Sequence, residues 1–135
     1  MRVFLDTNVL VSAVSTRGLC SDVMQICLAE HQIVVGQTVL EELERVLGSK
    51  LRLPPATVEE MDSFLRRRAV VIEAGPLLTM DLPDPTDIPV LSEACAGGAE
   101  VLVTGDRDLL ELGSDAPLPI LSPRDFWERL RSEAR

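Results

Sequence analysis

The stretch Val3-Phe4-Leu5-Asp6-Thr7-Asn8 begins with three apolar residues that run directly into a carboxylate. A second stretch, Val101-Leu102-Val103-Thr104-Gly105-Asp106, has a similar apolar run near the other end of the chain, and its acid follows the run after Thr104-Gly105. Short apolar runs of this kind are typical of buried strands in a parallel sheet. Ligands of open α/β sheets bind beyond the carboxyl ends of the strands, so we expect Asp6 and Asp106 at the functional edge of such a sheet.

Further apolar runs alternate with helical patterns along the chain. We expect strands at 33–35, 70–72 and, more briefly, 119–121, and helices over about 9–30 (with a break near Gly18), 38–47, from near 57 to 68, from near 87 to 97, and from Ser122 onward. This alternation predicts an α/β fold with a mostly parallel central sheet of about four to five strands flanked by helices. A length of 135 residues suits a single domain over 1–135.

Several helix starts carry candidate capping residues. The spacing of a capping box occurs at Thr38 with Glu41, at Thr57 with Glu60 and at Ser122 with Asp125. Asn8 and Thr86 are further candidate caps, for the helices expected from about 9 and from about 87. If Asn8 caps the first helix, the carboxylate of Asp6 is free for chemistry.

The composition limits the classes of function. With 13 basic and 22 acidic residues, the net charge of −9 argues against a protein that holds nucleic acid by charge alone. It is compatible with an enzyme acting on nucleic acid, because bound metal ions reverse the local charge at a carboxylate cluster. The apolar runs are too short for a membrane span, and the acid at position 6 is too early for a signal peptide. Three cysteines without a C-x-x-C pair predict free thiols in a reducing cytoplasm.

Acidic residues occur in four groups along the chain. The groups are Asp6; Glu41, Glu42 and Glu44; Asp84 and Asp87; and Asp106 and Asp108. Each acid alone has an ordinary structural role as a cap, a turn residue or part of a solvated helix face. Carboxylates held close together repel one another, so a fold that gathers them is expected to do so around hard cations. Periodicity places Glu42 and Glu44 on the two flanks of an apolar arc and does not choose between them.

These residues together resemble the PIN domain, in the form found in toxins of toxin–antitoxin systems. The resemblance runs from Val3 to about Ser122. It is carried by the segments 4–13 (FLDTNVLVSA), 39–47 (VLEELERVL), 84–87 (DPTD) and 98–110 (GAEVLVTGDRDLL). It implies a PIN-like three-layer fold and a metal-dependent endoribonuclease that cleaves RNA phosphodiester bonds. A small antitoxin protein and a homodimer are the implied partners.

The resemblance also implies the roles of single residues. The implied catalytic and metal-binding acids, which would hold Mg²⁺ or Mn²⁺, are Asp6, Glu42, Asp87 and Asp106. The implied accessory residues are Asn8, Asp84, Thr104 and Asp108. One departure is Thr86, because relatives often carry an acid at this position.

Two alternatives remain open from the sequence. A phosphatase or phosphotransfer domain would use Asp6 as a nucleophile. Against it, Asn8 stands where one large phosphatase family needs a second Asp, and the single lysine, Lys50, follows a helix rather than a strand. A catalytically silent interaction module is the second alternative, which the change at Thr86 keeps open.

Overall fold

The computed structural model describes residues 1–73 and 75–134. The strands are β1 (Arg2–Leu5), β2 (Gln32–Gly36), β3 (Val70–Ile72), β4 (Val101–Val103) and β5 (Ile120–Leu121). The α-helices are α1 (Thr7–Ser15), α2 (Leu19–Glu30), α3 (Gln37–Arg45), α4 (Pro55–Arg68), α5 (Asp87–Ala96), α6 (Arg107–Leu110) and α7 (Pro123–Glu133). A π-helical turn, η1 (Val46–Lys50), continues α3, and a short 3₁₀ turn, η2 (Gly113–Asp115), follows α6.

The five strands form one sheet in the order β3-β2-β1-β4-β5, and every pair is parallel. This confirms the predicted sheet. The central strand β1 pairs on one side with β2 and on the other with β4, so that Val3 lies opposite both Ile33 and Val101. Because parallel strands end at the same edge, the residues that follow β1 and β4 are brought together there.

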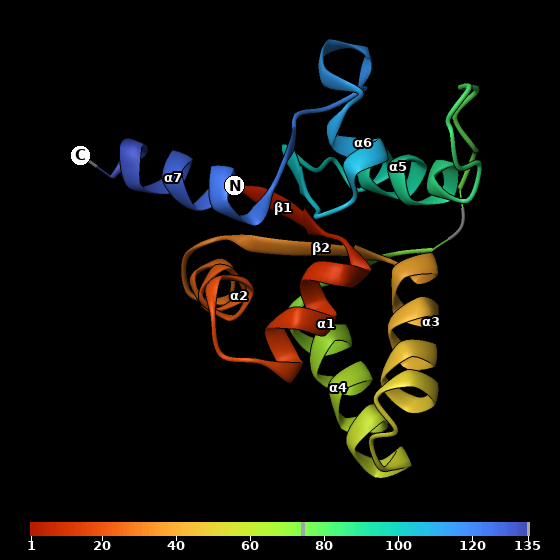
Figure 1. The fold of residues 1–135 in the computed structure, drawn as a ribbon, viewed down its shortest axis with the longest axis vertical. Helices are drawn as coiled ribbons and strands as arrows, with labels where there is room; N and C mark the ends of the chain where they lie inside the picture. Colours follow the sequence, from red (N-terminus) through yellow and green to blue (C-terminus); the bar gives the residue numbers. More distant parts are fainter. Residues whose placement is uncertain (74, 135) are drawn as a thin grey trace.

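Helices cover both faces of the sheet (Figure 1). The helices α1, α2, α3 and α4 lie on one side of the strands, and α5 and α6 lie on the other. The last helix, α7, contacts α2 and β5. The arrangement is a three-layer α/β/α fold, as predicted.

The apolar core is built from strand residues that are buried on both faces of the sheet. Phe4 and Leu5 of β1 and Leu102 of β4 are fully buried, and Leu91 of α5 and Phe126 of α7 belong to the same core. Burying one such side chain contributes about 1.5–3 kcal/mol. The strand ends are therefore held firmly, and so are the polar residues that follow them. In the described residues no helix combines the length and the apolar character that crossing a membrane requires.

The start of the first helix differs from the sequence-based expectation. The predicted break near Gly18 is confirmed, since α1 ends at Ser15 and α2 begins at Leu19. However, α1 begins at Thr7, and its N-cap is Asp6, whose Oδ1 accepts a hydrogen bond from the Thr7 N–H at 2.8 Å. Asn8 lies inside the helix, so the prediction that it caps the helix was wrong.

Of the three predicted capping boxes, only the last has its capping residue in place. Oγ of Ser122 accepts a hydrogen bond from the Asp125 N–H at 3.1 Å. The helix α4 begins earlier than expected, at Pro55, whose fixed φ suits a first helical position, and Thr57 is therefore not its cap. Thr38 is likewise already inside α3, because this helix begins at Gln37.

Candidate active site

A cleft of about 530 Å³ opens at the carboxyl edge of the sheet, with walls from α1, α3 and α5. Its lining includes five carboxylates: Asp6, Glu42, Asp84, Asp87 and Asp106. These five acids come from four separate parts of the chain and include all four of the predicted metal ligands. The structure therefore brings the predicted acids to one cleft.

Asp6 is held at the inner end of the cleft. It is only 7% exposed, because it follows the buried strand β1 directly and caps α1. Its Oδ2 accepts a hydrogen bond from the Thr104 hydroxyl at 2.7 Å. Burial raises the pKa of Asp6, whereas the bonds from Thr104 and Thr7 act in the opposite direction. The carboxylate is therefore fixed in orientation by donors on both of its oxygens.

Asn8 and Thr104 connect the ends of β1 and β4. The Asn8 amide group lies 3.4 Å from both Asp6 Oδ2 and Thr104 Oγ1, and its Oδ1 accepts a hydrogen bond from the Gly105 N–H at 3.0 Å. The Asp106 N–H donates to Thr104 Oγ1, also at 3.0 Å. These two of the four predicted accessory residues thus contact the acids, and the network sets the path of the chain between Thr104 and Asp106.

The helix α3 supplies Glu42 to the opposite wall of the cleft. Glu42 and Val46 are one helical turn apart and both line the cleft. Glu44 instead lines a separate pocket between α3, η1 and α4. Glu41 accepts a hydrogen bond from Gln37 on the surface of α3, at 3.3 Å. The choice between Glu42 and Glu44 that periodicity left open is therefore resolved in favour of Glu42 as the cleft residue.

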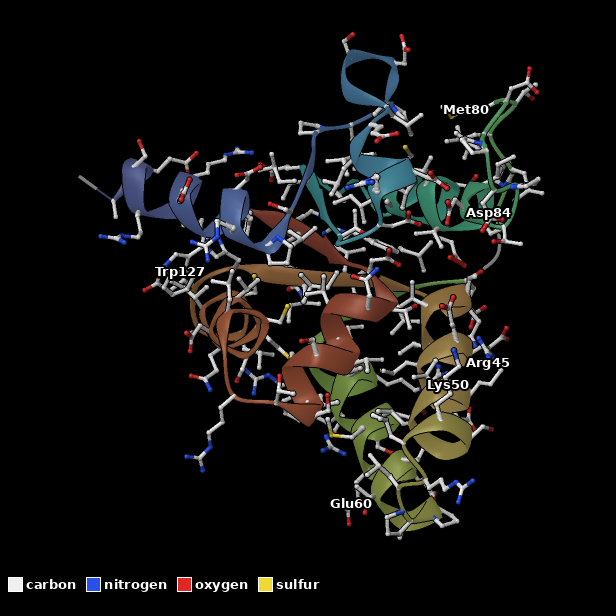
Figure 2. All side chains as sticks on the ribbon, in the orientation of Figure 1. Arg45, Lys50, Glu60, Met80, Asp84 and Trp127 are labelled. Carbon is white, nitrogen blue, oxygen red and sulfur yellow. The ribbon has the colours of Figure 1, made fainter. Side chains whose placement is uncertain are left out.

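The loop ahead of α5 supplies Asp84 and Asp87. Oδ1 of Asp84 accepts hydrogen bonds from the N–H and the hydroxyl of Thr86, at 3.0 and 2.7 Å. Thr86 is therefore a donor to Asp84 and makes no side-chain cap of α5. Figure 2 shows Asp84 beside α5, across the cleft from the helix α3 that carries Arg45.

Asp87, the first residue of α5, has an oxygen without a partner. Its Oδ2 is buried and makes no hydrogen bond within the described chain. Burial raises the pKa of Asp87 to about 7, and the negative charges of Asp106, Asp84, Asp6 and Asp108 act in the same direction. The cleft therefore concentrates negative charge around a carboxylate oxygen that nothing in the described residues neutralises.

Asp106 and Asp108 have different places. Asp106 lines the cleft and also caps α6, since its Oδ1 accepts a hydrogen bond from the Asp108 N–H at 3.0 Å. The Asp108 side chain is exposed and is not part of the cleft lining. Its charge still raises the pKa of Asp87, as the smallest of the five causes. Asp108 is therefore a neighbour of the acid group rather than a member of it.

Two observations bear on whether the cleft fits a metal ion, and they point in opposite directions. Across residues 1–73 and 75–134, no three Asp, Glu, His or Cys side chains approach closely enough to hold an ion in common. The predicted convergence within bonding distance is thus not seen. The donor set nevertheless consists of carboxylates, the ligands that Mg²⁺ and Mn²⁺ prefer, and the unpartnered Asp87 Oδ2 offers an oxygen with no competing donor. The residues present fit a hard divalent cation.

Sequence reasoning missed the hydroxyl side chains of α1 that line the cleft. Ser12 and Ser15 follow Asn8 at four and seven residues, so the three side chains share one face of the helix. Their helical spacing from Asn8 was available as a signal. It was lost because the helix was expected to begin after Asn8.

Solved structures resemble this fold at low sequence identity. A chain of VapBC2 from Rickettsia felis, solved with a DNA fragment from the promoter, has a TM-score of 0.64 and 20% identity, over 90% of the present chain and 98% of that chain. A chain of VapBC-1 from nontypeable Haemophilus influenzae has a TM-score of 0.65 and 16% identity, over 92% and 99%. The structure of the PIN domain endonuclease Utp24 has a TM-score of 0.53 and 19% identity, over 90% and 84%.

Sequence comparison gives a family but no individual relative. A search of curated protein sequences finds no match. The sequence profile of the PIN domain matches residues 2–108, which include β1 to β4 and all five acids of the cleft. The chain therefore belongs to the PIN-domain family.

Proposed function

We propose that this PIN-domain chain is a metal-dependent endoribonuclease and the toxin of a toxin–antitoxin pair. The observation that carries the proposal is the gathering of five carboxylates from separate elements in one cleft, around the unpartnered Oδ2 of Asp87. Hydrolysis of a phosphodiester near neutral pH needs an activated water and stabilisation of negative charge. Divalent cations provide both, and a group of carboxylates binds such cations.

In this proposal, the residues that would hold one or two Mg²⁺ or Mn²⁺ ions are Asp6, Glu42, Asp87 and Asp106, which all line the cleft. Such ions, when bound, would supply a water of lowered pKa and would offset negative charge on the phosphate. The protein's own groups fix the ligands. Thr104 and the Thr7 N–H hold the two oxygens of Asp6, whereas Asp87 keeps Oδ2 free of protein donors.

The proposed substrate is RNA. The side chains of Ser12 and Ser15 line the cleft and offer hydroxyl groups to the sugars or phosphates of a strand. A strand cannot approach this acidic cleft without cations, because its phosphates would be repelled by the carboxylates. Utp24, one of the similar structures, is a PIN domain endonuclease, which supports a nuclease activity for the present chain.

The proposed partner is a small antitoxin, bound to a homodimer of this chain. Two of the similar structures are of VapBC assemblies, one of them with promoter DNA, which supports a partner protein here as well. The cysteines Cys20, Cys27 and Cys95 are free, which suits the cytoplasmic location we propose. We also propose that residues 1–135 act as a single domain, since β5 pairs with β4 and α7 contacts α2.

Cleavage assays test the proposed activity directly. The purified chain, Asp6→Asn and Asp106→Asn are incubated with mixed RNA and with single-stranded DNA, in Mn²⁺ and in excess chelator. We expect Mn²⁺-dependent cleavage of RNA by the wild type only, because both variants lose a charged ligand while keeping their shape. Equal cleavage by all three proteins would mean a contaminant or a different site. Cleavage of DNA but not of RNA would reject RNA as the substrate. Detection of a phosphoryl group covalently bound to Asp6 would favour a phosphatase instead of a nuclease.

A further inference from the structure

A second buried acid, Glu93 of α5, lies outside the cleft and joins two of its walls. Glu93 is 4% exposed and is not part of the cleft lining. Its Oε1 accepts two hydrogen bonds from Thr38 on α3, one from the backbone N–H at 3.0 Å and one from the hydroxyl at 2.8 Å. A single carboxylate therefore connects α5 to the first turn of α3.

The chain around Glu93 leaves room for this contact. Gly36, which precedes α3, lies so close to Glu93 that a Cβ at this position would overlap its carboxyl group. Gly36 also provides no side chain to cap α3. An anion at a helix N-terminus is favoured by the free N–H groups and by the helix dipole. Glu93 thus serves as the missing cap, from a residue 55 positions away from Thr38.

Only one of the two carboxyl oxygens of Glu93 takes part in this contact. Oε2 of Glu93 is buried and makes no hydrogen bond with the described residues. A buried polar atom without a partner disfavours folding, whereas an apolar side chain of similar size would fill the same space without this cost. The two bonds to Thr38 are therefore what the acid contributes, and they act on the position of α3.

The two helices that Glu93 connects carry two of the cleft acids. Glu42 follows Thr38 by four residues, so both lie on the same face of α3. Asp87 is the first residue of α5, the helix that carries Glu93. We propose that Glu93 is a positioning residue: by accepting both bonds from Thr38 it fixes α3 against α5 and sets the spacing of Glu42 and Asp87 across the cleft. This inference rests on the proposed metal-dependent nuclease.

Three variants of the full chain weaken the contact between Glu93 and Thr38 to different degrees. Glu93→Gln keeps the acceptor oxygen for Thr38, Glu93→Met removes it at similar volume, and Thr38→Val removes the hydroxyl but keeps the N–H. We expect the affinity for Mn²⁺, measured by calorimetry, to be unchanged in Glu93→Gln and about 10-fold weaker in Glu93→Met, the lower end for residues that orient metal ligands. Thr38→Val should fall between them. Phe126→Leu, a core change in α7 away from the cleft, is the control for a general loss of stability.

A second measurement tests the contact between Glu93 and Thr38 in the absence of metal. Hydrogen exchange at the Thr38 amide should be faster in Glu93→Met and near wild type in Glu93→Gln, because this amide donates to Glu93. Wild-type Mn²⁺ affinity in Glu93→Met, or an equal loss in Phe126→Leu, would overturn the inference and leave the proposed nuclease standing. If Glu93→Met does not fold, unchanged affinity in Thr38→Val overturns it. A wild type that binds no Mn²⁺ would overturn both proposals.

Discussion

The hydroxyl of Thr104 donates a hydrogen bond to Oδ2 of Asp6 at 2.7 Å and joins two residues that are 98 positions apart. The hydroxyl oxygen of Thr104, Oγ1, in turn accepts a hydrogen bond from the Asp106 N–H at 3.0 Å. One short side chain therefore sets both the orientation of Asp6 and the course of the chain into Asp106. This is possible because β1 and β4 are neighbouring parallel strands that end together.

Thr104→Val tests this link, since valine has the shape of threonine but neither donates nor accepts. We expect Mn²⁺ affinity to fall by roughly 10-fold, as for other residues that orient metal ligands. The free energy of unfolding should fall by about 1–3 kcal/mol, because the variant leaves a buried carboxylate and an amide without their partner. Calorimetry and urea denaturation measure the two effects. Thr57→Val, at an exposed threonine of α4, is the control. If Thr104→Val bound Mn²⁺ as tightly as Thr57→Val, the role of Thr104 would be contradicted.

Glu42 and Glu44 provide a matched pair of acids on one helix. Only Glu42 lines the cleft, whereas Glu44 lines a pocket beside α4. We expect Glu42→Gln to lower kcat/KM for RNA by at least roughly 10- to 100-fold, the range for residues that only orient a metal ligand. Glu44→Gln should change it by no more than about twofold, the usual range for surface substitutions. Initial rates on labelled RNA measure both, and equal losses in the two variants would contradict the assignment of Glu42.

The sheet and the place of the acids at its edge were predictable from the sequence. Strands buried on both faces need continuous apolar runs, so Val3-Phe4-Leu5 and Val101-Leu102-Val103 give a strong local signal. An acid directly after such a run has a defined position as soon as the strand is recognised. Asp6 and, through Thr104, Asp106 were located in this way.

The helix starts and the Glu93 contact were not predictable in the same way. Thr38 has the spacing of a capping box with Glu41, yet its N–H bonds to Glu93, which is distant in the sequence. Such contacts depend on how α3 and α5 pack, and no local pattern encodes that packing. The binding of one metal ion by all four acids stays a prediction. Without a cation, the like-charged carboxylates repel one another and lie apart along the cleft.

The raised pKa of Asp87, about 7 against an ordinary value of 3.8, predicts how stability depends on pH. Between these values the folded protein binds a proton that the unfolded chain has lost, so the free energy of unfolding decreases as pH rises. We expect metal-free protein to lose stability from about pH 4 to about pH 7 and Asp87→Asn to show a smaller slope. The raised pKa of Asp6 leaves a residual slope of the same sign. Urea denaturation in chelator measures this, and parallel curves for wild type and Asp87→Asn would contradict it.

Metal binding should depend on pH in the opposite direction. A cation that binds Asp87 must displace its proton below about pH 7, so Mn²⁺ affinity should rise with pH and level off above that value. Asp84→Asn keeps an oxygen to accept the Thr86 hydrogen bonds but removes a charge that raises the Asp87 pKa, so its curve should level off at lower pH. Calorimetric Mn²⁺ titrations between about pH 5.5 and 8 measure both curves. Glu44→Gln should leave the midpoint unchanged, whereas an affinity independent of pH in the wild type would remove Asp87 from the ligand set.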